Sequence, residues 1–152
     1  LYMMNYLYGM DYVKEVVANT TYVASSTAGP DSVARGEYAI TVTGEANIGK
    51  KIGEGDPVAY VCPEEGTGFR IEGSAILANC KNLDSAKKFI DFMTTKEAFE
   101  IVRTECNRRA VSTEIPGPEN LPALSDLKFF EYDAVKAKEM KKGLISEFNA
   151  LL

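Results

Sequence analysis

The chain has 152 residues, of which 45% are hydrophobic and 26% charged, and it carries a formal net charge of -5. This composition is ordinary for a globular protein, and the acidic balance disfavours nucleic acid or an anionic membrane as a partner. The absence of histidine excludes a Ser-His-Asp or Cys-His nucleophile and any histidine metal site within the chain. We therefore expect no metal and no cofactor. No apolar run reaches about 18 residues, so no membrane span is expected.

The first third of the chain alternates between helical and extended patterns. Apolar residues recur at helical spacing over Leu1–Asn19, where Gly9 weakens the middle and favours a kink. A short β-prone segment, Thr21–Ala24, follows. Pro30 then opens a helix that ends at Gly36, which fits a glycine C-cap.

Three further strands are predicted, and they come from the middle of the chain. They cover Tyr38–Val42, Pro57–Cys62 and Ile71–Asn79, and a short helix over Gly44–Gly53 separates the first two. Because these strands alternate with helices, the predicted fold class is α/β.

The C-terminal half is predicted to be mostly helical. Asn82 caps one helix, a capping box over Thr94–Glu97 starts a second, and Asp133 opens the last one. Residues 107–131 are rich in proline and indicate an extended, wrapping segment.

Three cysteines, Cys62, Cys80 and Cys106, show no CxxC spacing, so a zinc or redox motif is not indicated. They are interpreted as small buried hydrophobic residues. A Cys62–Cys80 bridge stays an alternative.

Two short polar segments are candidate ligand sites. Ser25, Ser26 and Thr27 precede the helix opened by Pro30, where hydroxyls and free backbone N–H groups suit an anion. The alternative is that these residues only cap the helix. Thr43, Gly44 and Glu45 follow a predicted strand, and ligands of open α/β sheets bind beyond strand ends.

Each of the other charged motifs has two interpretations. Glu45 could accept hydrogen bonds from a ligand, or it could simply favour the first turn of a helix through the dipole. Glu64 and Glu65 could act as an acid–base pair or form a solvated turn. Arg108 and Arg109 could clamp an anion or form an ordinary surface pair.

Three motifs, in this order and spacing, resemble one family. They are VARGEYAI at Val33–Ile40, VAYVCPEEGT at Val58–Thr67, and GSAIL at Gly73–Leu77 followed by a lysine- and phenylalanine-bearing helix over Ser85–Met93. The chain resembles family-1 extracellular solute-binding proteins of ABC transporters, in the branch of iron(III), sugar-phosphate and phosphonate receptors.

The resemblance implies a type II periplasmic-binding-protein fold. This chain would supply the second lobe over residues 1–66, and over residues 67–152 a crossover and the C-terminal part of the first lobe with its terminal helices. It would thus be a C-terminal fragment without its export signal. With most of one lobe missing, we expect five apolar side chains to be partly exposed, namely Phe89, Phe92, Phe129, Phe148 and Leu151.

The resemblance also implies a function. Ferric receptors carry two adjacent tyrosines where this chain has Thr43, Gly44 and Glu45, which favours a small anionic, phosphorylated or similar solute over iron. Glu45 would then meet ligand hydroxyls and the serine-rich loop would meet the anion. Thr67, from the second motif, completes the candidate site. The chain would act outside the cytoplasm, in the periplasm or lipid-anchored at the cell surface, deliver its solute to an ABC permease, and catalyse nothing.

Alternative functions stay open. The same fold serves as the ligand-sensing module of regulators and histidine kinases. A ferric-ion receptor that lacks the tyrosine pair is a second alternative. An enzyme that uses Glu64, Glu65 or Cys62 is a third.

Overall fold

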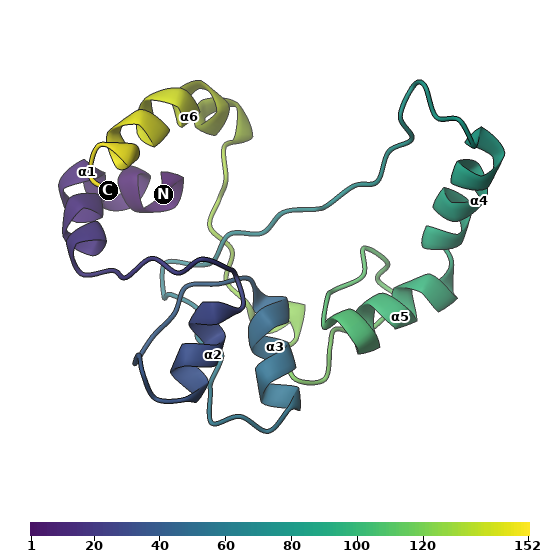
Figure 1. The fold of residues 1–152 in the computed structure, drawn as a ribbon, viewed down its shortest axis with the longest axis horizontal. Coiled ribbons are helices and arrows are strands. Elements are labelled where there is room, and N and C mark those ends of the chain that lie inside the picture. The colour runs from purple at the N-terminus through teal and green to yellow at the C-terminus, as the bar shows by residue number, and fades with distance from the viewer. The chain divides into compact units, whose positions relative to one another are not determined.

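The computed structural model describes residues 1–152, which divide into two units (Figure 1). Unit 1 contains Leu1–Tyr22, Pro63–Phe69 and Lys128–Leu152. Unit 2 contains Val23–Cys62 and Arg70–Leu127. Each unit is therefore assembled from segments distant in sequence. The predicted division into 1–66 and 67–152 stays a prediction.

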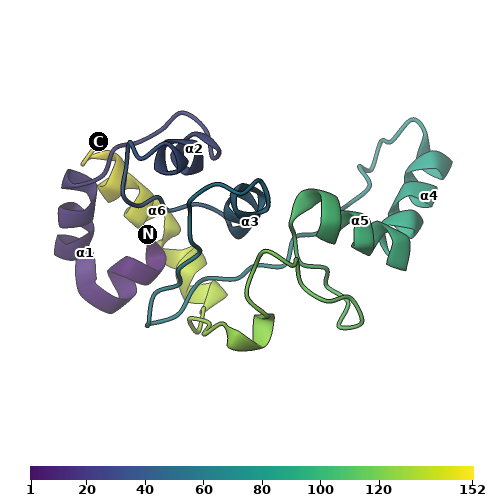
Figure 2. The same cartoon turned by 90° about the horizontal axis from the view of Figure 1, so that it is seen from below.

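Unit 1 is built on two helices, α1 (Tyr2–Ala18) and α6 (Ala134–Asn149), which lie side by side in both Figure 1 and Figure 2. Their shared interior holds Val13, with 2% of its surface exposed, together with Ala137 and Leu144. Gly9 adopts φ 78° and ψ 174° inside α1, so the predicted kink is confirmed. This conformation suits glycine because no Cβ opposes a positive φ.

The Pro63–Phe69 segment of unit 1 packs along the chain that leads into α6. The Thr67 N–H donates to the Lys128 carbonyl (2.9 Å), and the Phe130 N–H donates to the Thr67 carbonyl (3.0 Å). These two bonds form an isolated parallel β-bridge between Thr67 and Phe129. The rings of Phe69 and Phe129 lie 5.4 Å apart and add apolar contact at the same place.

Unit 2 contains α2 (Ala28–Ala34) and α3 (Glu45–Gly53), which pack against each other. The predicted ending of α2 at Gly36 is confirmed, because Gly36 has φ 74° and the Glu37 N–H donates to the Ser32 carbonyl (2.8 Å). An ion pair joins the two helices, in which Lys51 Nζ lies 2.9 Å from the Asp31 carboxylate.

The remaining helices of unit 2 are α4 (Leu83–Met93), α5 (Lys96–Cys106) and the 3₁₀ turn η1 (Leu124–Asp126). The predicted capping box over Thr94–Glu97 does mark the start of α5, but the cap is Thr95 rather than Thr94, since the Thr95 hydroxyl accepts from the Ala98 N–H (3.2 Å). Likewise the Asp133 carboxylate of unit 1 accepts from the Lys136 N–H (2.9 Å) at the start of α6.

Several apolar side chains remain uncovered. Phe89 on α4 is 58% exposed, and the other four named in the prediction are exposed or half-buried. All three cysteines are free thiols, so the Cys62–Cys80 bridge is absent. Cys106 is exposed rather than buried, which corrects the interpretation of that residue. None of the helices combines the length and apolarity that a membrane span requires.

The predicted α/β class is wrong, and the type II periplasmic-binding-protein fold fails with it. The structure contains helices and no sheet, and the Thr67–Phe129 bridge is its only β pairing. Tyr38–Val42, Pro57–Cys62 and Ile71–Asn79 run as non-helical segments without a ladder. The physical reason is that β-branched side chains favour an extended backbone, but a strand also needs a neighbouring backbone to pair with. None is present, and Ile40 and Val42 are 82% and 90% exposed.

Candidate functional site

The loop before α2 is organised by its own hydroxyl groups. The hydroxyls of Ser25 and Thr27 lie 3.2 Å apart, and Ser25 Oγ accepts from the Ala28 N–H at 3.2 Å. Ser25 therefore does serve the first residue of the helix, as the capping alternative predicts. The side chains of Ser25, Ser26 and Thr27 are all exposed, so their remaining hydrogen-bonding capacity faces solvent.

The start of α3 is hydrogen-bonded to this loop. Thr43 Oγ1 donates to the Ser26 carbonyl (3.1 Å), and Asn47 Nδ2 donates to the same oxygen (3.1 Å). Asn47 Nδ2 also contacts Thr43 Oγ1 (3.0 Å), which closes a small network. Gly29 permits close approach as well, since a Cβ there would lie 2.3 Å from Thr41 Oγ1. Two of the predicted polar segments are thus held together.

Glu45 is the first residue of α3, after the extended residue Gly44. A carboxylate there is favoured by the positive end of the helix dipole. It is also paired, because Arg109 Nε lies 3.0 Å and 3.1 Å from its two oxygens. Arg109 Nη2 donates in addition to the Pro122 carbonyl (2.8 Å). The Arg109 and Glu45 side chains are only 14% and 28% exposed, so this ion pair is largely shielded from water.

The half-buried side chain of Tyr60 lies near the same ion pair. Burial raises the pKa of Tyr60, the Cys62 thiol at 3.2 Å and the nearby negative charge of Glu45 raise it further, and Arg109 opposes them. The Tyr60 hydroxyl therefore stays protonated at neutral pH.

Thr67 belongs to the other unit, where its backbone forms the bridge to Phe129. The neighbouring glutamates are engaged separately. Glu65 accepts from the Tyr8 hydroxyl, which lowers the pKa of Glu65, and Lys128 Nζ donates to the Glu64 backbone carbonyl (2.8 Å). This part of unit 1 has the character of a turn fixed to its surroundings.

The two adjacent arginines also have separate partners. Arg108 pairs with Glu72 (2.6 Å), and the two side chains are 54% and 63% exposed. Arg109 pairs with Glu45 instead. The pair therefore does not form one clamp.

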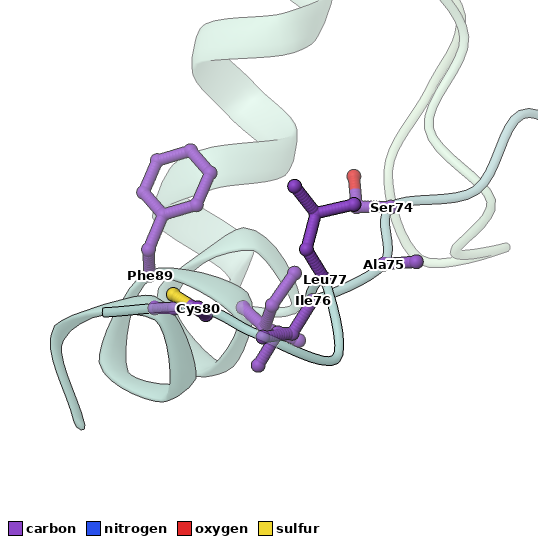
Figure 3. Close-up of a pocket in the computed structure, with 8 residues that line it drawn as sticks. Ser74, Ala75, Ile76, Leu77, Cys80 and Phe89 are labelled. Atoms are coloured by element: carbon purple, nitrogen blue, oxygen red, sulfur yellow. The ribbon is translucent and has the colours of Figure 1, made fainter. Parts of the chain in front are cut away.

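Unit 2 also contains an apolar hollow of about 460 Å³, which opens to solvent (Figure 3). Figure 3 shows Ile76 and Leu77 on one side and Phe89 on the other, with Cys80 between them. No charged side chain lines this hollow, and none of the predicted site residues reaches it. No group of three or more Cys, Asp or Glu side chains is placed to hold a metal ion.

Asn47 was not identified from the sequence as part of this region, and the partner of Arg109 was not identified either. Asn47 lies four residues after Thr43 on the way into α3, and that spacing could have placed both on one face. Arg109 was interpreted only together with Arg108, as an anion clamp or a surface pair. Its partner Glu45 is 64 residues away, and no local pattern indicates such a contact.

Comparison with known proteins gives one family. The model of the family described as "Bacterial extracellular solute-binding protein" matches residues 9–125. A Haemophilus influenzae protein (strain ATCC 51907 / DSM 11121 / KW20 / Rd), named only "Uncharacterized protein", is 31% identical over 143 residues. That alignment covers 91% of this chain and 41% of the relative, so the chain spans well under half of the relative's length. No solved structure matches the chain.

Proposed function

Because this chain belongs to the bacterial extracellular solute-binding protein family, we propose that it captures a small anionic solute, phosphorylated or similar, for an ABC importer. It acts outside the cytoplasm, and its partners are the solute and the membrane permease. The role is binding and release, without catalysis. The family is established by the match, whereas the anionic specificity rests on the residues described above.

One observation carries the proposal, namely that Ser26 joins the two polar segments. Its carbonyl accepts from both Thr43 and Asn47, which brings the hydroxyl-bearing loop to the N-terminus of α3. Hydroxyl donors beside Glu45 suit a solute with an anionic end and a hydroxyl-bearing end.

The assigned roles follow from donor and acceptor chemistry. Ser25, Ser26 and Thr27 offer O–H or N–H donors to the anion, and Thr43 and Gly44 shape the approach to it. The Glu45 carboxylate only accepts, so it suits solute hydroxyls.

Small molecules that remain bound to the purified full-length protein test this proposal. The protein is denatured and the released molecules are identified by mass spectrometry, while thermal unfolding is followed with inorganic phosphate, sulfate, a phosphonate and a hexose monophosphate. We expect a phosphorylated solute and a raised midpoint with an anion. Release of a neutral or cationic molecule, with no anion raising the midpoint, contradicts the anionic assignment.

A further inference from the structure

We propose that Arg109 is the positioning residue that lets Glu45 work within a site for anions. The inference rests on the proposed function and deepens it. Arg109 Nε contacts both oxygens of the Glu45 carboxylate (3.0 and 3.1 Å), while Nη2 is fixed by the Pro122 carbonyl at 2.8 Å. The arginine comes from the wrapping segment after α5 and thus orients a carboxylate at the start of α3.

The need for this arginine is electrostatic. Glu45 lies between Thr43 and Asn47, both of which hold the serine-rich loop through the Ser26 carbonyl. An unpaired carboxylate there would repel the anion that the loop is proposed to bind. Pairing with Arg109 cancels that charge, and because the pair is largely shielded from water, its influence on the site is screened only weakly.

The surroundings are shaped for a guanidinium rather than an ammonium. A Cβ at Gly117 would lie 2.8 Å from Arg109 Nη1, so the glycine leaves room for the third nitrogen of the side chain. Lysine could balance the charge of Glu45, but its single nitrogen cannot also reach the Pro122 carbonyl in the same fork geometry. The chain provides a matched control in Arg108, which is exposed and paired with Glu72 away from Glu45.

Calorimetric titration of the full-length protein with inorganic phosphate and with a hexose monophosphate tests the inference. We expect Arg109→Gln to weaken binding of both probes at least tenfold, and Arg108→Gln to leave both within twofold. Inorganic phosphate has no sugar hydroxyls that need an acceptor. Glu45→Gln/Arg109→Gln should therefore recover phosphate binding to within threefold while hexose monophosphate stays weak.

Glu45→Gln alone keeps the test decisive if Arg109→Gln does not fold. It leaves Arg109 without its carboxylate, so inorganic phosphate should bind severalfold more tightly. Unchanged or weaker phosphate binding by Glu45→Gln, or equal binding by wild type and a folded Arg109→Gln, overturns the inference alone. A wild-type protein that binds neither probe overturns the proposed anionic function, and the inference with it.

Discussion

Substitution of Gly66 by alanine should selectively destabilise unit 1. Gly66 has φ 112°, and a Cβ would lie 2.8 Å from the Phe130 backbone nitrogen and 2.9 Å from the Phe129 carbonyl carbon. Backbone atoms cannot yield as a flexible side chain can. The positive φ alone costs about 1 to 3 kcal/mol for a residue with a Cβ. Loss of the two bridge hydrogen bonds of Thr67 adds about 1 kcal/mol each.

A total of about 3 to 5 kcal/mol is a large part of the stability of an ordinary domain. Urea unfolding followed by tyrosine fluorescence measures it, because the chain has no tryptophan and six of its eight tyrosines lie in unit 1, namely Tyr2, Tyr6, Tyr8, Tyr12, Tyr22 and Tyr132. Gly143→Ala is the matched control. Gly143 is exposed inside α6 with no atom near its Cβ position, so alanine should stabilise by about 0.5 to 1 kcal/mol. A Gly66→Ala midpoint equal to that of wild type would refute the reasoning.

Three further predictions concern single contacts of unit 2. Arg35 lowers the pKa of Glu37 from 4.5 to about 2, so the contribution of Glu37 is complete above pH 4.5 and lost as the pH falls towards 2. Glu37→Gln should flatten the acid-unfolding profile in that window, and an unchanged slope speaks against the pair. Lys51 lowers the pKa of Asp31, so Lys51→Met should raise the Asp31 pKa in a carboxyl NMR titration, and an unmoved pKa refutes this. Thr95→Ala should lower the free energy of unfolding, followed by circular dichroism, by about 1 kcal/mol. An unchanged free energy of unfolding would show that the Thr95 cap does not stabilise α5.

The helices could be predicted from the sequence because their signals are local. Gly36 ends α2 through its own backbone conformation. Thr95 and Asp133 cap α5 and α6 by accepting from the backbone N–H group three residues further along the chain. Each of these helix ends is set by residues within one or two helical turns of one another. The sequence around each end therefore contains all the residues that determine it.

The strands and the ion pair could not be predicted in the same way. Ile40 and Val42 favour an extended backbone, but sheet formation depends on a partner elsewhere, and these side chains remain exposed. The pairing of Glu45 with Arg109 likewise spans 64 residues. The grouping of the serine-rich loop with Thr43 was expected from the family resemblance, and in the structure the two segments are joined through the Ser26 carbonyl.

The most direct test of the central claim is a calorimetric titration of the full-length protein with a hexose monophosphate, beside the same neutral hexose. The account predicts saturable binding of the phosphorylated sugar, at least tenfold weaker binding of the neutral sugar, and loss of that preference in Ser25→Ala/Thr27→Ala. Equal binding of both sugars, or a preference that survives without the two hydroxyls, would contradict it.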